Sequence, residues 1–256
     1  MLFTDQELLN LNARGLIPGP QESEQEFLQR LKKLEAVSVE GTPLSQTDWE
    51  EALAVLEPLY GVRPDWIKAY YSNRKLPFWQ AAATWIEESI PSIQLKTPFQ
   101  TGSYYKLYSR KEVLAHEAVH AARTAFNEPR FEEIFAYRTS TSFLPRWIGP
   151  LFRRSWESYA LMILLPLLAT PLFSLPLLAI ALGSLRLAHA HWHLYCCAKR
   201  LKLLVDNPDA VLLRLTDREI LMFGRMSEES IKSYVTGGAY LRLRMLHLVI
   251  NSRCSK

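Results

Sequence analysis

Apolar residues recur at helical spacing through most of residues 1–91, and this pattern predicts a helical N-terminal region. The clearest helix follows a polar start at residues 45–48 and has its apolar positions at Trp49, Ala52, Leu53, Leu56 and Leu59. Residues 21–38 and 77–90 show similar spacing. We therefore expect a set of helices that pack together and carry no chemistry of their own.

The pattern changes between residues 92 and 108. Residues 93–97 alternate between apolar and polar side chains, residues 104–108 are rich in aromatic side chains, and Gly102-Ser103 lies between the two segments. Alternation bounded by a glycine predicts two short strands or a hairpin.

Helical spacing resumes from about residue 109 to residue 126. Asn127-Glu128-Pro129 interrupts it, and a second helix is expected from residue 130 to about residue 143. This helix should end before Pro145, because proline disfavours helical backbone at the preceding residue.

The longest uncharged stretch of the chain lies between residues 159 and 185, and after Arg186 no charge follows until Lys199. A bilayer crossing needs ~20 apolar residues, and basic residues flank the stretch on both sides. Because basic flanks favour the cytoplasmic side, the pattern predicts a transmembrane hairpin over residues 156–198 with its turn at residues 171–176. A single tilted crossing and a re-entrant hairpin are the alternatives. Arg186 would then reach an interface or pair with protein.

Residues 199–256 are polar and helical in pattern. Helix starts are expected near Asn207, Thr216 and Ser227, which are residues that cap helix N-termini. The basic and apolar stretch at residues 241–246 could lie against protein or against anionic lipid.

Composition narrows the class of protein. The chain has 256 residues and a net charge of only +4, so charge gives no reason to expect a nucleic-acid partner. Three cysteines, two of them adjacent, do not form a disulfide framework, which favours a reducing, cytosol-facing location for the polar parts. The N-terminus lacks a basic segment leading into an apolar run, so no cleaved signal peptide is expected.

The motif that carries chemistry is His116-Glu117-Ala118-Val119-His120. In a helix, His116 and His120 project from one face and can bind a single metal ion. Neutral imidazole suits Zn²⁺, and Glu117 beside the first ligand can take a proton from a metal-bound water. A catalytic zinc site needs a third protein ligand as well as an open position.

This arrangement resembles the gluzincins, the zinc metallopeptidases related to thermolysin and the zinc aminopeptidases. In that family the third ligand is a glutamate on a later helix, and the resemblance puts Glu133 at that position, with Ala136 and Tyr137 on the small and aromatic positions; Glu132 is the alternative. The resemblance covers roughly residues 92–140. It also implies that residues 92–108 bind an extended peptide. A metzincin is excluded, because no third histidine follows in residues 121–124.

Other polar residues have weaker claims on the site. Arg110, Lys111, Glu112 and Arg123 bracket the metal helix, so we expect it in water beside the membrane, with Arg123 on the surface. A transition-state donor would be one of several residues: Tyr137, Tyr234, Tyr240 or His247. His189, His191 and His193, spaced by two, are expected on different helix faces and, with Trp192 and Tyr195, are read as an interfacial belt.

Together these patterns predict a mainly α-helical protein with a small β element. Its parts are a helical region at residues 1–91, a zincin-like catalytic unit at 92–145, a transmembrane hairpin at 156–198 and a helical region at 199–256. The expected protein is a membrane-anchored zinc metallopeptidase that acts on peptides beside a lipid bilayer, a multi-pass protein with both termini and the catalytic unit cytoplasmic. The alternative is a non-catalytic membrane scaffold whose zinc site is structural or vestigial.

Overall fold

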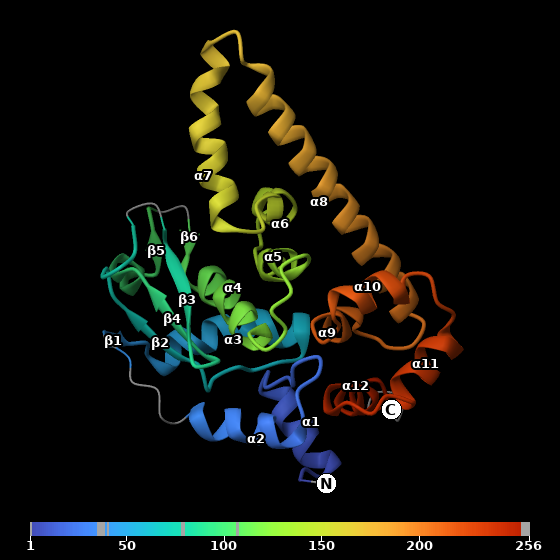
Figure 1. Ribbon diagram of the computed structural model, residues 1–256. Helices are drawn as coiled ribbons and strands as arrows, with labels where there is room; N and C mark the ends of the chain where they lie inside the picture. Colours follow the sequence, from blue (N-terminus) through green and yellow to red (C-terminus); the bar gives the residue numbers. More distant parts are fainter. Residues whose placement is uncertain (1, 35–38, 40, 78–79, 106–107, 252–256) are drawn as a thin grey trace.

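The computed structural model describes the chain except for residues 1, 35–38, 40, 78–79, 106–107 and 252–256. The described chain is mainly helical, with a small sheet at one side (Figure 1). Helix α4 (Arg110–Arg123) packs against strands of this sheet, and α3 (Gln46–Tyr60) packs against α4.

The sheet has four strands in the order β1 (Thr42–Pro43), β2 (Lys68–Tyr71), β4 (Ile90–Leu95), β3 (Ala82–Glu87). The centrally placed β4 is buried along its whole length, runs parallel to β2 and is antiparallel to β3. Among the described strands, β3 is paired on one side only. This edge faces the region where the metal motif lies.

The prediction of helix over residues 77–90 is wrong, because residues 82–87 of that segment form β3 and Ile90 begins β4. Residues 84–86, Thr-Trp-Ile, are β-branched or aromatic and fit a pleated surface, and their pairing with β4 overrides the weak helical spacing. The expected boundary between residues 91 and 92 falls inside β4.

Of the two alternatives for residues 92–108, short strands are confirmed, and a hairpin between residues 93–97 and 104–108 is wrong. The first segment belongs to β4, whereas β5 (Ser103–Tyr104) pairs with β6 (Tyr108–Ser109) in a separate two-stranded ribbon. Residues 106–107 lie outside the described part of the chain.

The two ends of the chain share one apolar cluster. Leu8 lies in α1 (Asp5–Ala13), and Phe3 precedes this helix. Both pack with Phe27 of α2 (Glu24–Lys33) and with residues of α12 (Leu241–Asn251). The main core, in turn, draws buried side chains from α3, the sheet, α4 and the C-terminal helices. The N-terminal and C-terminal regions are therefore packed against each other and against the sheet.

Helix starts in the C-terminal region are confirmed. Asn207 caps α9 (Pro208–Leu212), Thr216 forms a capping box at α10 (Asp217–Phe223), and Ser227 caps α11 (Glu228–Thr236). These starts were predictable because a cap is a contact between residues three positions apart.

Protein, not lipid, covers the basic stretch in α12. Arg242 is buried and its guanidinium lies 2.6 Å from a carboxylate oxygen of Glu219 in α10.

The second helix expected after the metal motif is shorter than predicted. Helix α5 (Glu132–Tyr137) ends well before Pro145, and a separate helix, α6 (Phe143–Ile148), contains that proline in its first turn, where no helical N–H is required.

The predicted transmembrane hairpin is wrong, and so is the multi-pass localisation built on it. No helix among the described residues combines the length and the apolar character that a bilayer crossing requires. The uncharged stretch is divided: α7 (Ser155–Leu164) has ten residues, a 3₁₀ turn (Leu165–Ala169) follows, and α8 (Ser174–Leu201) carries Arg186 and further basic residues. Ten residues rise about 15 Å, half of the ~30 Å hydrocarbon core.

Candidate metal site

Helix α4 supplies three polar side chains to one partly buried face. His116, Glu117 and His120 lie one turn apart or adjacent, while the opposite face is formed by small or apolar residues buried in the core: Leu114, Ala115, Ala118, Val119, Ala121 and Ala122. Small side chains on that face let α4 lie close to the sheet and to α3, which fixes the direction of the two imidazoles.

Helix α5 brings two carboxylates to the same place. Glu132 and Glu133 lie in its first turn, and Phe135 anchors the helix in the core. The buried hydroxyl of Tyr60, in α3, donates a 2.7 Å hydrogen bond to the carbonyl oxygen of Phe135. Both α4 and α5 are thus held against α3.

Three ligand atoms converge between these helices. Nε2 of His116 lies 3.3 Å from Nε2 of His120, and the Glu133 oxygens lie 3.8 Å from the first and 3.7 Å from the second. Two ligands of a tetrahedral zinc ion, each about 2.1 Å from the metal, are about 3.4 Å apart. One ligand atom from each of the three residues can be chosen so that all lie within 4.8 Å of one another, and the group could therefore hold a metal ion such as zinc. Elsewhere in the described chain no group of three metal-binding side chains is this close.

Glu132 occupies a different position from Glu133. Its Oε1 lies 2.9 Å from Nδ1 of His120, the ring nitrogen that does not face the other ligand atoms. A carboxylate at that distance fixes the orientation of the ring, as carboxylates commonly do for metal-binding histidines. The geometry thus separates the two glutamates that the sequence left open: Glu133 among the ligand atoms, Glu132 behind one ligand.

Glu117 lies beside the triad but outside it. The Thr84 hydroxyl, on the edge strand β3, donates a 2.7 Å hydrogen bond to Oε2 of Glu117. Sequence patterns do not identify this partner, because helical spacing predicts a helix for the segment that contains Thr84. The bond holds the carboxylate at the side of the metal site that faces β3.

The charges around the site favour a bound cation. Burial, followed by the charge of His120, lowers the pKa of His116 well below its usual value. Burial also lowers the pKa of His120, but the hydrogen bond with Glu132 and the charges of Glu133 and Glu117 outweigh it and raise this pKa to about 9. Burial raises the pKa of Glu133 to about 7. The three carboxylates therefore keep His120 protonated at neutral pH, and a bound metal ion would replace that proton.

The site opens into a cleft of about 480 Å³. Ala82 of β3 forms one wall, and Phe152, Arg154 and Tyr159, at the base of α7, lie on another. Of the four candidate donors named from the sequence, Tyr137 lines the cleft. Its ring centroid lies 4.6 Å from that of His116, and burial, followed by the charge of Glu133, raises its pKa to about 12. The phenol therefore keeps its proton at neutral pH.

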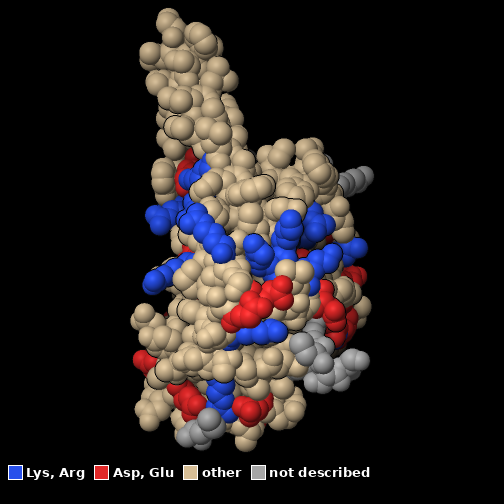
Figure 2. Space-filling model, turned by 90° about the vertical axis from the view of Figure 1, so that its right-hand side faces the viewer, with Lys and Arg blue, Asp and Glu red and all other residues tan. Residues whose placement is uncertain are grey.

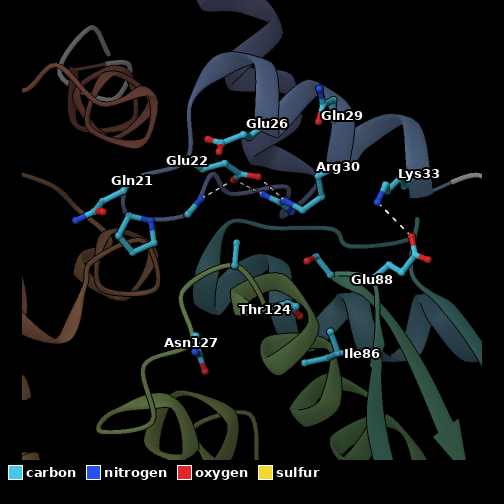
Figure 3. Close-up of a pocket in the computed structure, with 14 residues that line it drawn as sticks. Gln21, Glu22, Glu26, Gln29, Arg30, Lys33, Ile86, Glu88, Thr124 and Asn127 are labelled. Carbon is cyan, nitrogen blue, oxygen red and sulfur yellow. Dashed lines mark hydrogen bonds and ion pairs between the residues drawn. The ribbon is translucent and has the colours of Figure 1, made fainter.

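A larger pocket, of about 880 Å³, lies between α2 and the far end of β3 (Figure 3). Four of its five charged side chains form pairs: Arg30 pairs with Glu22 at 2.8 Å, and Lys33 pairs with Glu88 at 3.2 Å. The fifth, Glu26, accepts hydrogen bonds from Ser23. The lining residues contain no histidine or cysteine. The lining therefore offers no imidazole or thiolate ligand of the kind found in the metal cleft, to which β3 links this pocket.

Two sequence-based expectations near the site are wrong. Arg123 is fully buried and not on the surface, and it donates to the carbonyl oxygens of Leu213 and Leu215 at 2.5 and 3.1 Å. His189 and His193 share one face of α8, with their Nε2 atoms 3.0 Å apart, because they are four residues apart. No third ligand joins this pair within the described chain.

Comparison with known proteins finds no matching family profile, no similar curated protein and no similar solved structure.

The affinity for zinc should rise with pH. His120 has a pKa of about 9 in the metal-free protein and must lose its proton to bind the metal. We expect roughly tenfold tighter binding per pH unit from 7 to 9, a plateau above 9, and a steeper fall below 7, where Glu133 also takes a proton. Competition against a chromophoric chelator at several pH values measures this. A constant affinity from pH 7 to 9 would contradict the assigned ligand set.

Proposed function

We propose that the protein is a zinc-dependent peptidase. The observation that carries the proposal is the convergence of His116, His120 and Glu133 at zinc-ligand spacing, with Glu117 next to them and outside the ligand set. A purely structural zinc site is closed by four protein ligands, whereas a catalytic one keeps an open position and a base beside it. Three ligands and an adjacent cleft correspond to the second kind.

Each group at the site has a separate task in this proposal. Zinc bound there would polarise the scissile carbonyl and lower the pKa of a water molecule toward ~7. Glu117 accepts the proton of the attacking water and passes it to the leaving amine. Thr84 keeps the Glu117 carboxylate directed along the β3 side of the cleft. Tyr137, protonated and in the cleft, is placed to donate a hydrogen bond to the developing oxyanion.

The edge strand β3 is the surface on which we expect the peptide to bind. An extended peptide can add to the unpaired side of an edge strand through main-chain hydrogen bonds. Within the sheet we assign the peptide to residues 82–87 and not to residues 92–95, because the central strand β4 has no free side among the described strands. A peptide along β3 would run from the metal cleft at Ala82 toward the pocket at Ile86 and Glu88 (Figure 3).

The gluzincin resemblance supports the same reaction. Glu133 follows the second histidine on a separate helix, and Ala136 and Tyr137 follow it as the resemblance implies. The link between α4 and α5 is short, only residues 124–131, so this site would be a compact variant of that arrangement.

Metal removal tests the proposal. The purified protein should contain about one zinc ion per chain and should cleave a pool of unstructured fluorogenic peptides. Dialysis against 1,10-phenanthroline should abolish cleavage, and zinc, but not magnesium, should restore it. If the zinc-loaded protein cleaves none of the peptides, the result favours the alternative function, a non-catalytic protein whose zinc site is structural or vestigial.

A further inference from the structure

The hairpin formed by α7, the 3₁₀ turn and the first half of α8 exposes one continuous apolar surface. No charged residue lies between Glu157 and Arg186. Large apolar side chains are exposed at every level up to the tip: Met162, Ile163, Leu165, Leu168, Leu172, Phe173, Leu175, Leu177, Leu178, Leu182 and Leu185. The hairpin stands away from the rest of the molecule (Figure 1), and its surface above the base carries no charge (Figure 2). Proteins rarely expose a patch of this extent to water without a partner.

Several polar groups of the turn at the tip are hydrogen-bonded within the turn. The N–H groups of Thr170, Phe173 and Leu175 donate to carbonyl oxygens three residues earlier, at 3.0 to 3.1 Å. The Thr170 hydroxyl donates to the carbonyl oxygen of Leu167 at 2.8 Å and accepts from the N–H of Leu172 at 3.2 Å. In hydrocarbon, each unpaired backbone group would cost several kcal/mol, so a tip of this kind is suited to a medium without hydrogen-bonding partners.

The base of the hairpin has the opposite character. Between Glu133 and Asp206 the chain has one acidic residue, Glu157, against eight basic ones. Of these, Arg138 pairs with Asp209, and Lys199, Arg200 and Lys202 lie more than three turns beyond Arg186, so the base itself carries Arg146, Arg153, Arg154 and Arg186. Glu157 is neutralised by Arg186, whose guanidinium lies 2.6 Å from it. Figure 2 shows basic side chains gathered in a band beneath the uncharged protrusion. This band is complementary to an anionic surface.

Exposed aromatic and apolar residues lie at the same level as the upper part of this basic band. Helix α6, between the lower ends of α7 and α8 in Figure 1, exposes Phe143, Leu144, Trp147 and Ile148, and Trp156 is exposed at the start of α7. Tryptophan concentrates at the boundary between lipid headgroups and hydrocarbon, because one end of the ring is apolar and the other donates a hydrogen bond.

We propose that the hairpin inserts into one leaflet of an anionic lipid bilayer without crossing it. The uncharged part of α8, residues 174–185, rises about 18 Å, which is close to the thickness of one hydrocarbon leaflet. Insertion to that depth puts Trp156 and α6 at the headgroup level and the arginines at the base among the phosphates. A lipid occupant accounts for the apolar surface on all sides of the hairpin, for the satisfied turn and for the basic band together.

The inserted hairpin would hold the metal cleft next to the lipid surface. Phe152, Arg154 and Tyr159 belong both to the base of the hairpin and to the wall of the cleft. Insertion itself does not depend on zinc or on peptide cleavage, and a His116→Ala variant should bind vesicles as the native protein does.

Sedimentation of the full-length protein with vesicles tests the inference. The native protein should bind vesicles containing phosphatidylglycerol, and Leu172→Asp together with Phe173→Asp should weaken binding at least tenfold, since each charge must enter hydrocarbon. The matched control introduces the same two charges at exposed apolar positions far from the hairpin, Leu2→Asp and Tyr240→Asp, and should retain native binding. Thermal melting confirms that both variants are folded.

Depth and specificity provide the second measurement. Tryptophan fluorescence of a Leu172→Trp variant, compared with the native protein, should be quenched most by lipids brominated deep in the acyl chain. Three results would overturn the inference. The native protein could fail to bind vesicles, or the Leu172→Asp/Phe173→Asp variant could bind them equally well. In the third case the native protein does not bind vesicles but forms a dimer in solution, and the variant is monomeric. Equal affinity for neutral vesicles would remove the role of the basic band.

Discussion

Replacing Glu117 by glutamine should lower kcat/KM for peptide cleavage by about a thousandfold while leaving zinc bound. The three ligand atoms come from other residues, so the metal site keeps its full set. Glutamine has nearly the same shape as glutamate and can still accept the hydrogen bond from Thr84, but its neutral amide cannot take a proton from water. Losing a positioned general base typically costs 10² to 10⁴ in rate. The measurement is steady-state cleavage, together with zinc content by mass spectrometry.

A matched substitution separates the base from its support. Thr84→Val removes the hydroxyl that holds Glu117 and keeps a β-branched side chain on β3, whereas Thr84→Ser keeps the hydroxyl. The valine variant should lose activity well short of the Glu117→Gln loss, and the serine variant should recover most of it. Full activity of zinc-loaded Glu117→Gln would remove Glu117 from the mechanism.

Glu133→Ala and Glu132→Ala should differ by one to two orders of magnitude in their effect on zinc affinity. Glu133 supplies one of three ligand atoms, so its loss should weaken binding by about a thousandfold. Glu132 contacts only the outer nitrogen of His120, and the loss of such a partner typically costs 10 to 100-fold. Competition titrations against chelators of graded affinity at one pH measure both.

The reverse order would exchange the roles of the two glutamates and move the metal toward the first residue of α5. Lys111→Ala, an exposed change on α4 outside the cleft, is the control and should leave zinc affinity unchanged.

Contacts between residues close in the sequence could be predicted reliably from the sequence. Helix α4 and the starts of α9, α10 and α11 could be predicted because a capping residue or a repeat of three to four positions is a contact between near neighbours. The metal triad followed in part from the same rule, since His116 and His120 are one turn apart. Choosing Glu133 over Glu132 needed the angle between α4 and α5, which spacing alone does not encode.

Contacts between segments far apart in the sequence could not be predicted from it. β3 was missed because its partner β4 stabilises it, and Thr84 was missed with it. Arg123 was assigned to the surface because the two carbonyl oxygens that it binds come some ninety positions later. The transmembrane prediction is wrong for another reason. An uncharged stretch does not show where the chain turns, and a turn at residues 170–173 divides this one into arms that are each too short or too polar to cross a bilayer.

The burial of Arg123 bears on when the protein can become active during its synthesis. The same helix that holds both histidines ends in this arginine, and its charge is stabilised by the carbonyl oxygens of Leu213 and Leu215. A growing chain on the ribosome contains the whole motif long before those carbonyls have emerged, and until then α4 has an unpaired cation where the core should close. The proposed peptidase centre would thus be completed only after residues 213–215 have been synthesised, and a chain that stops before residue 213 should lack it.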